Sequence, residues 1–302
     1  MKRPDLKVKI KSLQLRSPLI LCSGTAGFGL ELKPYLDFKY VGALITKTIT
    51  LNKREGNPPP RIVETPSGVI NSIGLENPGL RGFLTQWPEI KKLPVQIIVS
   101  IYGENKREYE IIFRELNRIK EIKGVEVNLS CPNLEKKIIS QDKKKSFSLV
   151  RYLRGLTKKI LIVKLSPEVS DIVEIAESIL KAGADVLSLT NTFSALKIDI
   201  GKRKPFLGNI FGGLSGPAIK PLVLYRVYRV YQALRCPIIA SGGVLNYKDA
   251  LEFILAGATG IGLGTANLVE PDSAEIIFKD LLSYMKKNKI SSLKNLVGNG
   301  CK

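Results

Sequence analysis

Cys131 is the residue of this sequence that is best suited to acid–base or nucleophilic chemistry. It lies in residues 127–133 (VNLSCPN), where an apolar strand ends and a proline interrupts regular structure. The 302-residue chain contains no histidine, so proton transfer would fall to a carboxylate, a lysine, a tyrosine or a cysteine. Because a lone cysteine is more often a buried structural thiol, Cys131 by itself leaves both interpretations open.

Two lysines interrupt segments that are otherwise apolar and strand-like. Lys47 ends residues 41–47 (VGALITK), and Lys164 lies in residues 159–165 (KILIVKL). A buried ammonium group is costly unless an anion meets it, so both lysines indicate a binding site for an anionic group.

Glycines follow the last two predicted strands, in residues 241–243 (SGG) and 262–265 (GLGT). Glycine lets backbone N–H groups approach a phosphate closely, and barrel enzymes commonly bind phosphate after their last two strands. FMN fits this pattern, because it has one phosphate and a ring that needs a nearby cation. The glycines of residues 24–29 lack the Rossmann spacing and predict a tight loop beside a flat ligand.

Three asparagines, Asn71, Asn128 and Asn191, lie in segments expected at the same end of the strands. An amide both donates and accepts hydrogen bonds, which suits a small ring that carries alternating N–H and C=O groups. Together with Lys47 they form a predicted recognition set.

The elements that must position these residues alternate between apolar, β-branched runs and amphipathic segments. We predict strands at 18–23, 41–47, 94–100, 124–130, 159–165, 185–190, 237–241 and 260–263, and helices at 104–121, 169–182, 217–234 and 246–256. Strands buried on both faces are typical of a parallel sheet. Eight such units predict one α/β domain over residues 1–302, a (β/α)8 TIM barrel with long active-site loops at 50–80 and 191–216. An open doubly wound sheet is the alternative.

Composition narrows the class of function. The net charge of +20 is spread along the chain in short lysine runs without a nucleic-acid motif, so it favours attraction of anionic ligands over nucleic-acid binding. Four widely spaced cysteines and no histidine predict neither a metal site nor a disulfide framework. We see no signal peptide and no apolar run near the ~20 residues of a membrane span, so we expect a cytoplasmic protein.

The motifs together resemble those of class 1 dihydroorotate dehydrogenases, from about residue 5 to residue 296. The most specific matches are residues 46–50 (TKTIT), 56–61 (GNPPPR), 71–75 (NSIGL), 128–133 (NLSCPN), Lys164, 191–192 (NT), 213–217 (GLSGP), 241–243 (SGG) and 262–266 (GLGTA). The resemblance implies FMN-dependent oxidation of (S)-dihydroorotate to orotate in de novo pyrimidine (UMP) biosynthesis, with Cys131 as the catalytic base.

The same resemblance assigns binding residues by their positions in this sequence. The pyrimidine would be bound by Lys47, Asn71, Ser72, Ile73, Gly74, Leu75, Asn128, Asn191 and Thr192. FMN would be bound by Ser23, Lys47, Thr48, Asn128, Lys164, Thr190, Gly216, Gly242, Gly243, Gly264 and Thr265. Ser100 stands where the family often has asparagine, so a flavin contact there would be shorter or water-mediated.

Within class 1, residues 191–199 (NTFSALKID), 203–205 (RKP) and 212–216 (GGLSG) resemble the B type. This implies a partner subunit that carries FAD and a [2Fe-2S] cluster and passes electrons to NAD⁺, around a homodimer core of a heterotetramer. The alternatives are the fumarate-using A type, a related flavin barrel that oxidises dihydropyrimidines, a phosphate-binding lyase or isomerase barrel without flavin, and a non-enzymatic basic binding protein.

Overall fold

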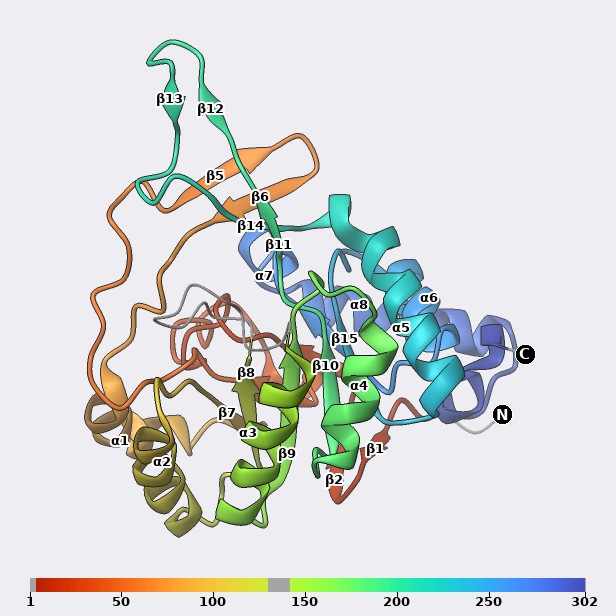
Figure 1. Ribbon diagram of the computed structural model, residues 1–302. Helices are drawn as coiled ribbons and strands as arrows, with labels where there is room; N and C mark the ends of the chain where they lie inside the picture. Colours follow the sequence, from red (N-terminus) through yellow and green to blue (C-terminus); the bar gives the residue numbers. More distant parts are fainter. Residues whose placement is uncertain (1–3, 130–141, 302) are drawn as a thin grey trace.

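The computed structural model describes residues 4–129 and 142–301, and its centre is a closed barrel of eight parallel strands (Figure 1). The strands are β3 (Leu19–Leu21), β4 (Ala43–Ile45), β7 (Gln96–Ile101), β8 (Gly124–Asn128), β9 (Ile160–Leu165), β10 (Val186–Leu189), β15 (Ile238–Ser241) and β16 (Gly260–Leu263). Each strand pairs with its neighbours in this order, and β16 pairs with β3 to close the ring. The predicted TIM barrel is therefore confirmed.

The barrel forms because its strands are apolar on both faces. Nearly every residue of these strands is buried, with the inner face filled by side chains and the outer face covered by helices. The helices are α1 (Gly79–Ile90), α2 (Lys106–Arg118), α3 (Lys143–Leu156), α4 (Ile172–Lys181), α5 (Lys220–Leu234), α6 (Tyr247–Leu255), α7 (Ala266–Val269) and α8 (Ser273–Lys287).

Asparagine and aspartate side chains begin several of these helices, as their preference for the N-cap predicts. Asn105 accepts a hydrogen bond from the Glu108 N–H at the start of α2, and Asp171 accepts one from Val173 at the start of α4. At α6, Asn246 and Asp249 form a reciprocal capping box. These caps fix where each helix begins, and so the length of the loop that precedes it.

The alternation of strand and helix is not uniform. The connection from β3 to β4 contains only turns and the 3-10 helix η1 (Phe38–Tyr40), where the expected βα repeat would have an α-helix. Short 3-10 helices also occur at η3 (Pro217–Ile219), η4 (Leu293–Leu296) and η5 (Asn299–Cys301). A hairpin of β1 (Val8–Ile10) and β2 (Leu13–Leu15) packs its apolar side chains against the core, and the Ile10 side chain lies close to Gly260 at the start of β16.

The two segments predicted as loops contain a second sheet, so the prediction of loops at 50–80 and 191–216 was wrong in part. Strands β5 (Ile62–Thr65), β6 (Gly68–Asn71), β14 (Gly212–Ser215) and β11 (Phe193–Ala195) form an antiparallel sheet, and β12 (Ile198–Asp199) pairs with β13 (Lys204–Pro205) in a projecting hairpin (Figure 1). These strands are two to four residues long, too short for a periodic pattern. The central pairing, β6 with β14, joins residues about 140 positions apart, which no local pattern reveals.

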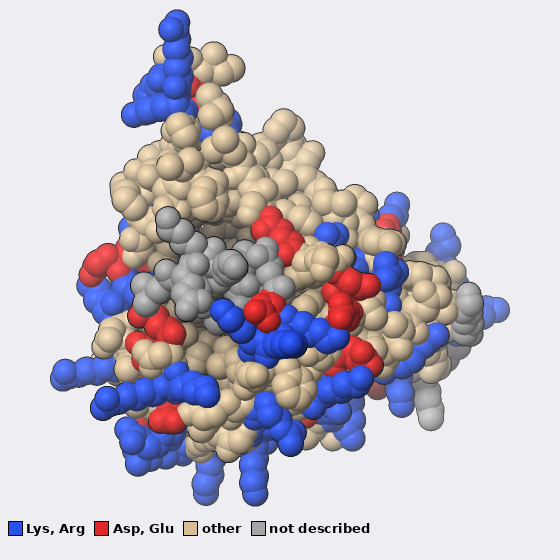
Figure 2. All heavy atoms as spheres, in the orientation of Figure 1, with Lys and Arg blue, Asp and Glu red and all other residues tan. Residues whose placement is uncertain are grey.

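Basic residues are scattered over the face seen in Figure 2, with a cluster at the tip of the projecting hairpin, where Lys202, Arg203 and Lys204 are exposed. This distribution matches the dispersed lysines of the sequence. Among the described residues, no helix is both long enough and apolar enough to cross a membrane.

Candidate active site

The predicted site residues lie at the carboxyl end of the barrel, with the antiparallel sheet beside it. Ser23, Lys47, Thr190 and Thr265 each follow directly or within two residues of a barrel strand, and Lys164 lies on β9 one residue before its end. Because the strands are parallel, their carboxyl ends meet at one face. The structure therefore brings together residues that are as much as 242 positions apart in the chain.

Lys164 and Asn128 are partners in the β8–β9 ladder, so their side chains leave neighbouring strands at the same level. Lys164 is half-buried, and its ammonium group forms no hydrogen bond or ion pair with any described residue. The positive charge of Lys164 interacts electrostatically with the buried thiol of Cys22. Burial raises the pKa of that thiol, the Lys164 ammonium opposes the rise, and the Glu126 carboxylate adds to it. An ammonium group in this position is suited to an anionic or electron-rich ligand.

The three asparagines predicted as a recognition set come from three different elements. Asn128 ends β8, and its Oδ1 accepts a hydrogen bond from Nδ2 of Asn191 over 3.5 Å. Asn191 also accepts from the Thr192 N–H through its own Oδ1 over 2.8 Å. Asn71 ends β6 in the antiparallel sheet and donates to the Gly213 carbonyl over 3.2 Å. The structure thus shows Asn128 and Asn191 in direct contact, whereas Asn71 is positioned separately by the second sheet.

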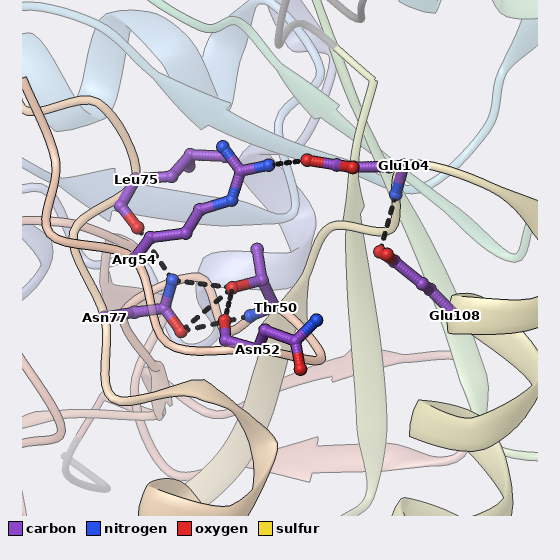
Figure 3. A network of polar contacts seen from close by, with 7 residues as sticks. All are labelled: Thr50, Asn52, Arg54, Leu75, Asn77, Glu104 and Glu108. Atoms are coloured by element: carbon purple, nitrogen blue, oxygen red, sulfur yellow. Dashed lines mark hydrogen bonds and ion pairs between the residues drawn. The ribbon is translucent and has the colours of Figure 1, made fainter.

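Leu75, the last residue of the predicted segment 71–75, is held by a network of polar contacts that the sequence analysis did not identify (Figure 3). Asn77 is 3% exposed, donates to the Leu75 carbonyl over 2.7 Å and to Thr50 Oγ1 over 2.9 Å, and accepts from the Gly79 N–H over 2.8 Å. Arg54 pairs with Asn77 through two backbone hydrogen bonds and forms an ion pair with Glu104. The Arg54–Glu104 ion pair therefore connects the loops after β4 and β7, next to the end of the predicted substrate segment.

The remaining members of that segment have partners of their own. Ser72 is buried, and its Oγ accepts from Nδ2 of Asn57 over 2.9 Å and from Nδ2 of Asn209 over 3.3 Å. The Ile73 carbonyl accepts a hydrogen bond from the Asn57 N–H over 3.0 Å. Gly74 has a φ of +75°, and a Cβ there would lie 2.5 Å from the Asn57 backbone nitrogen, so only glycine fits.

Lys47 lies beside an acidic side chain that the sequence analysis also missed. Its Nζ is 4.0 Å from Oε2 of Glu76, and Nη1 of Arg61 is 2.8 Å from the same oxygen. All three side chains are half-buried. Two cations facing one carboxylate leave a net positive charge at this edge, which suits an anionic ligand group.

The backbone after the last two barrel strands leaves N–H groups that could bind a phosphate. Among the described residues, the N–H groups of Gly243, Gly264 and Thr265 donate no hydrogen bond within the chain. A Cβ added to Gly264 would meet no atom within 4 Å, so this backbone faces open space. Thr265 Oγ1 donates to Ser215 Oγ over 2.8 Å. Gly216 and Gly242 flank the same region, where a Cβ on Gly243 would lie 2.9 Å from the Gly216 carbonyl oxygen.

The hydroxyl groups of Ser23, Thr48 and Ser100 form a hydrogen-bonded chain that leads into the barrel. Ser23 Oγ is 3.1 Å from Thr48 Oγ1, which is 2.9 Å from Ser100 Oγ. Ser100 is fully buried and donates to Oε1 of Glu126 over 3.2 Å. Ser100 is thus engaged with Thr48 and Glu126. Glu126 was missed, although a lone carboxylate in the apolar strand β8, two residues before Asn128, carries the same signal that identified Lys164.

Cys131 lies outside the described residues, and its role as the base stays a prediction. Thr190 is buried after β10, and its N–H donates to the Ser241 carbonyl over 3.1 Å. Thr192 is half-buried beside Asn191.

The described residues fit FMN. Unpaired backbone N–H groups after the last two barrel strands suit its phosphate, the Lys164 ammonium suits an electron-rich ring, and the hydroxyls of Ser23 and Thr48 suit a polar edge. Among the described residues, no group of three or more His, Cys, Asp or Glu side chains could hold a metal ion.

A TIM barrel with unpaired backbone N–H groups after its last two strands, a strand-end lysine and an amide pair is typical of barrel enzymes that bind a phosphorylated cofactor. A family model of dihydroorotate dehydrogenase matches residues 5–285. Two relatives are named dihydroorotate dehydrogenase B (NAD(+)), catalytic subunit. The one from Geotalea daltonii is 46% identical over 301 residues, 99% of each chain, and the one from Desulforudis audaxviator is 47% identical over 294 residues, 96% of each chain. The chain belongs to the dihydroorotate dehydrogenase family.

A solved structure shows the same fold. The crystal structure of DHODH in complex with ferulenol from Eimeria tenella has a TM-score of 0.81 and 24% sequence identity, over 98% of this chain and 88% of that chain. At this identity the similarity extends to the barrel architecture.

Proposed function

We propose that this chain is the FMN-binding catalytic subunit of an NAD⁺-linked dihydroorotate dehydrogenase, which oxidises (S)-dihydroorotate to orotate in pyrimidine biosynthesis. The observation that carries the proposal is the contact between Asn128 and Asn191 at the barrel mouth, beside the half-buried Lys164. An amide pair can recognise a ring that carries amide groups, and the cation beside it can stabilise an electron-rich cofactor. The near-full-length relatives named as B-type catalytic subunits support the same assignment.

The proposed substrate site follows from these contacts. Asn71, Asn128, Asn191 and Thr192 would hydrogen-bond the ring, and residues 72–75 would form one wall. Lys47 would neutralise the substrate carboxylate, since its own partner Glu76 is 4.0 Å away and is shared with Arg61. The backbone of residues 71–75 is fixed by Asn57 and Asn77, so the substrate would meet a largely preformed wall.

The proposed cofactor site uses further strand ends of the rim and shares Asn128 and Lys47 with the substrate site. Gly216, Gly242, Gly243, Gly264 and Thr265 would bind the phosphate, while Ser23, Thr48, Thr190, Asn128 and Lys164 would bind the rest of FMN. When bound, FMN would supply a hydride acceptor. Cys131 would remove the proton from C5 of the substrate as the hydride leaves C6, and Lys164 would stabilise negative charge on the reduced cofactor.

The partner subunit belongs to the same proposal. We infer that it carries FAD and a [2Fe-2S] cluster, and that two copies of this chain form the core of a heterotetramer. The term "catalytic subunit" in the names of the relatives supports a separate partner. Apolar side chains exposed on and beside the antiparallel sheet offer surface for subunit contacts: Ile62, Leu196, Ile198, Ile200, Ile210 and Phe211. The single FMN-binding domain over residues 1–302 and the cytoplasmic location stay predictions.

The test is a comparison of electron acceptors. The purified chain loaded with FMN should oxidise dihydroorotate with an artificial dye and should hardly reduce NAD⁺. Co-expression with the FAD and [2Fe-2S] subunit should make NAD⁺ reduction efficient. Rapid NADH formation by the chain alone would contradict the two-subunit proposal, and brisk turnover with fumarate would favour the A-type alternative. Absence of dihydroorotate oxidation with every acceptor would contradict the proposal as a whole.

A further inference from the structure

Glu126 is a buried carboxylate that none of the steps above uses. It lies on β8 two residues before Asn128, so both side chains point to the same side of the strand, and it is 1% exposed. Its Oε1 accepts a hydrogen bond from Ser100 Oγ over 3.2 Å, and Ser100 is its direct partner in the β7–β8 ladder. Burying a carboxylate is costly unless polar groups solvate it. A carboxylate retained in an apolar strand therefore indicates a specific role.

The hydroxyl chain connects this carboxylate with the rim of the site. Ser100, Thr48 and Ser23 follow one another at 2.9 Å and 3.1 Å between oxygen atoms. Burial falls along the way: Ser100 is fully buried, Thr48 is 6% exposed, and Ser23 is half-buried at the mouth of the barrel. The chain therefore leads from the barrel interior to the predicted cofactor site.

We propose that Glu126 is a positioning residue, which fixes the direction of the hydroxyl chain so that Ser23 and Thr48 present only hydrogen-bond acceptors to the bound cofactor. This inference rests on the proposed function and adds a requirement to it. The groups of FMN that meet these two side chains must be hydrogen-bond donors, such as its sugar-chain hydroxyls or a ring N–H.

The direction follows from counting protons. An ionised carboxylate only accepts, and each hydroxyl has one proton to donate. Ser100 uses its only hydroxyl proton in the hydrogen bond to Glu126. The Thr48 hydroxyl must therefore be the donor in the hydrogen bond between Thr48 and Ser100. Thr48 then has no proton for Ser23, and Ser23 must donate to Thr48. The protons of all three hydroxyls point inward, and lone pairs remain on the outer side.

Cys22 is a second buried group at this end of the barrel. Burial raises the pKa of its thiol, the Lys164 ammonium opposes the rise, and the Glu126 carboxylate adds to it. Cys22 itself contacts Ser241, with Sγ 3.2 Å from Oγ, and it forms no hydrogen bond with the hydroxyl chain. The hydroxyl chain therefore runs from Glu126 to Ser23 without involving Cys22.

The experiment measures FMN binding to the apoprotein, independently of dihydroorotate turnover. Glu126→Gln keeps the shape of the side chain, but its amide can donate to Ser100 and its charge is gone. We expect the Kd for FMN to rise about tenfold, the equivalent of one charge-assisted hydrogen bond. Ser178→Ala is the matched control, a buried serine on α4 that lies outside the hydroxyl chain and the barrel rim, and it should leave the Kd within about twofold.

A double-mutant cycle separates positioning from a direct effect of charge. If Glu126 acts through Ser100, then Glu126→Gln should change the Kd for FMN less than about twofold in a Ser100→Ala background. An equal loss in both backgrounds, or no loss in either, overturns the inference. Thermal unfolding of each apoprotein verifies folding. If the chain binds no FMN at all, the proposed function fails with it, which is a distinct result.

Should Glu126→Gln not fold, the adjacent link provides the same test. Ser100→Ala and Thr48→Val each interrupt the hydroxyl chain, and the proposal requires that their effects on FMN binding overlap. The double variant should bind FMN about as well as Thr48→Val alone. Fully additive losses would show that Ser100 does not act through Thr48, which also overturns the inference.

Discussion

Nδ2 of Asn191 donates a hydrogen bond to Oδ1 of Asn128 over 3.5 Å, although 63 residues separate them in the chain. Asn128 ends β8 and Asn191 follows β10, and β9 with Lys164 lies between these two strands. The contact fixes the amide orientation at both positions, since Asn191 uses its oxygen to accept from the Thr192 N–H. Asn128 therefore directs its amino group away from Asn191.

Asn191→Asp tests this arrangement with a nearly isosteric change. The carboxylate cannot donate to Asn128, and it would repel the carboxylate of dihydroorotate. We expect KM for dihydroorotate to rise about 10- to 100-fold, the loss of one to two hydrogen bonds to a charged ligand. Steady-state kinetics with a dye acceptor would measure it. The control is Asn288→Asp at the end of α8, which should leave KM unchanged. An unaltered KM in Asn191→Asp would exclude Asn191 from the substrate site.

Lys164→Gln should weaken FMN binding and lower the midpoint potential of the bound flavin. Reduction adds negative charge, and this variant removes a cation that forms no ion pair among the described residues. A redox titration against a reference dye gives the potential. Lys158→Gln, an exposed lysine before the same strand, is the matched control. If both variants kept the wild-type potential, Lys164 would have a structural role only.

Cys131→Ala should keep FMN bound, because the thiol is expected to act on the substrate. Flavin reduction by dihydroorotate should slow about 10²- to 10⁴-fold, the usual cost of losing a general base. Stopped-flow absorbance under anaerobic conditions measures this step directly. Cys301→Ala, which removes a thiol buried near the chain end, should reduce flavin at the normal rate. Normal reduction in Cys131→Ala as well would assign proton removal to another residue.

Asn77→Ala should affect both stability and substrate binding. The change leaves the Leu75 carbonyl and the N–H groups of Thr50 and Gly79 without their partner, which costs about 2 to 4 kcal/mol of unfolding free energy. Because residues 71–75 lose their anchor, KM for dihydroorotate should rise while FMN affinity stays the same. Chemical denaturation and FMN titration measure the two effects. Equal losses of substrate and FMN binding would instead indicate general unfolding of the site.

The buried thiol of Cys236 should make the protein less stable at alkaline pH. Burial raises the pKa of its thiol from 9.0 to about 11. The unfolded chain loses this proton near pH 9 while the folded chain keeps it, so the contribution is complete below pH 9 and declines as the pH rises toward 11. The total is roughly 2 to 3 kcal/mol. Unfolding free energies of wild type and Cys236→Ala across this range should therefore converge, and a constant difference would contradict the raised pKa.

The sequence alone determined the barrel and most of its rim. Apolar runs of four to six residues separated by amphipathic segments define buried parallel strands, and this local pattern predicts all eight barrel strands near their observed positions. Parallel topology then places every strand end on one face. For this reason the positions of Lys47, Asn128 and Lys164 at predicted strand ends are enough to group them at one site.

Only the tertiary structure decided how the antiparallel sheet and the buried polar groups are arranged. β6 and β14 are four residues each and pair across a long stretch of chain, so their register has no local signal. The roles of Asn77 and Glu126 depend on partners from other strands and loops. Thr50 meets Asn77 through the folding of the long connection after β4, and Ser100 meets Glu126 through the pairing of β7 with β8. Hydrogen bonds depend on distances of a few tenths of an ångström, which residue spacing along a sequence does not encode.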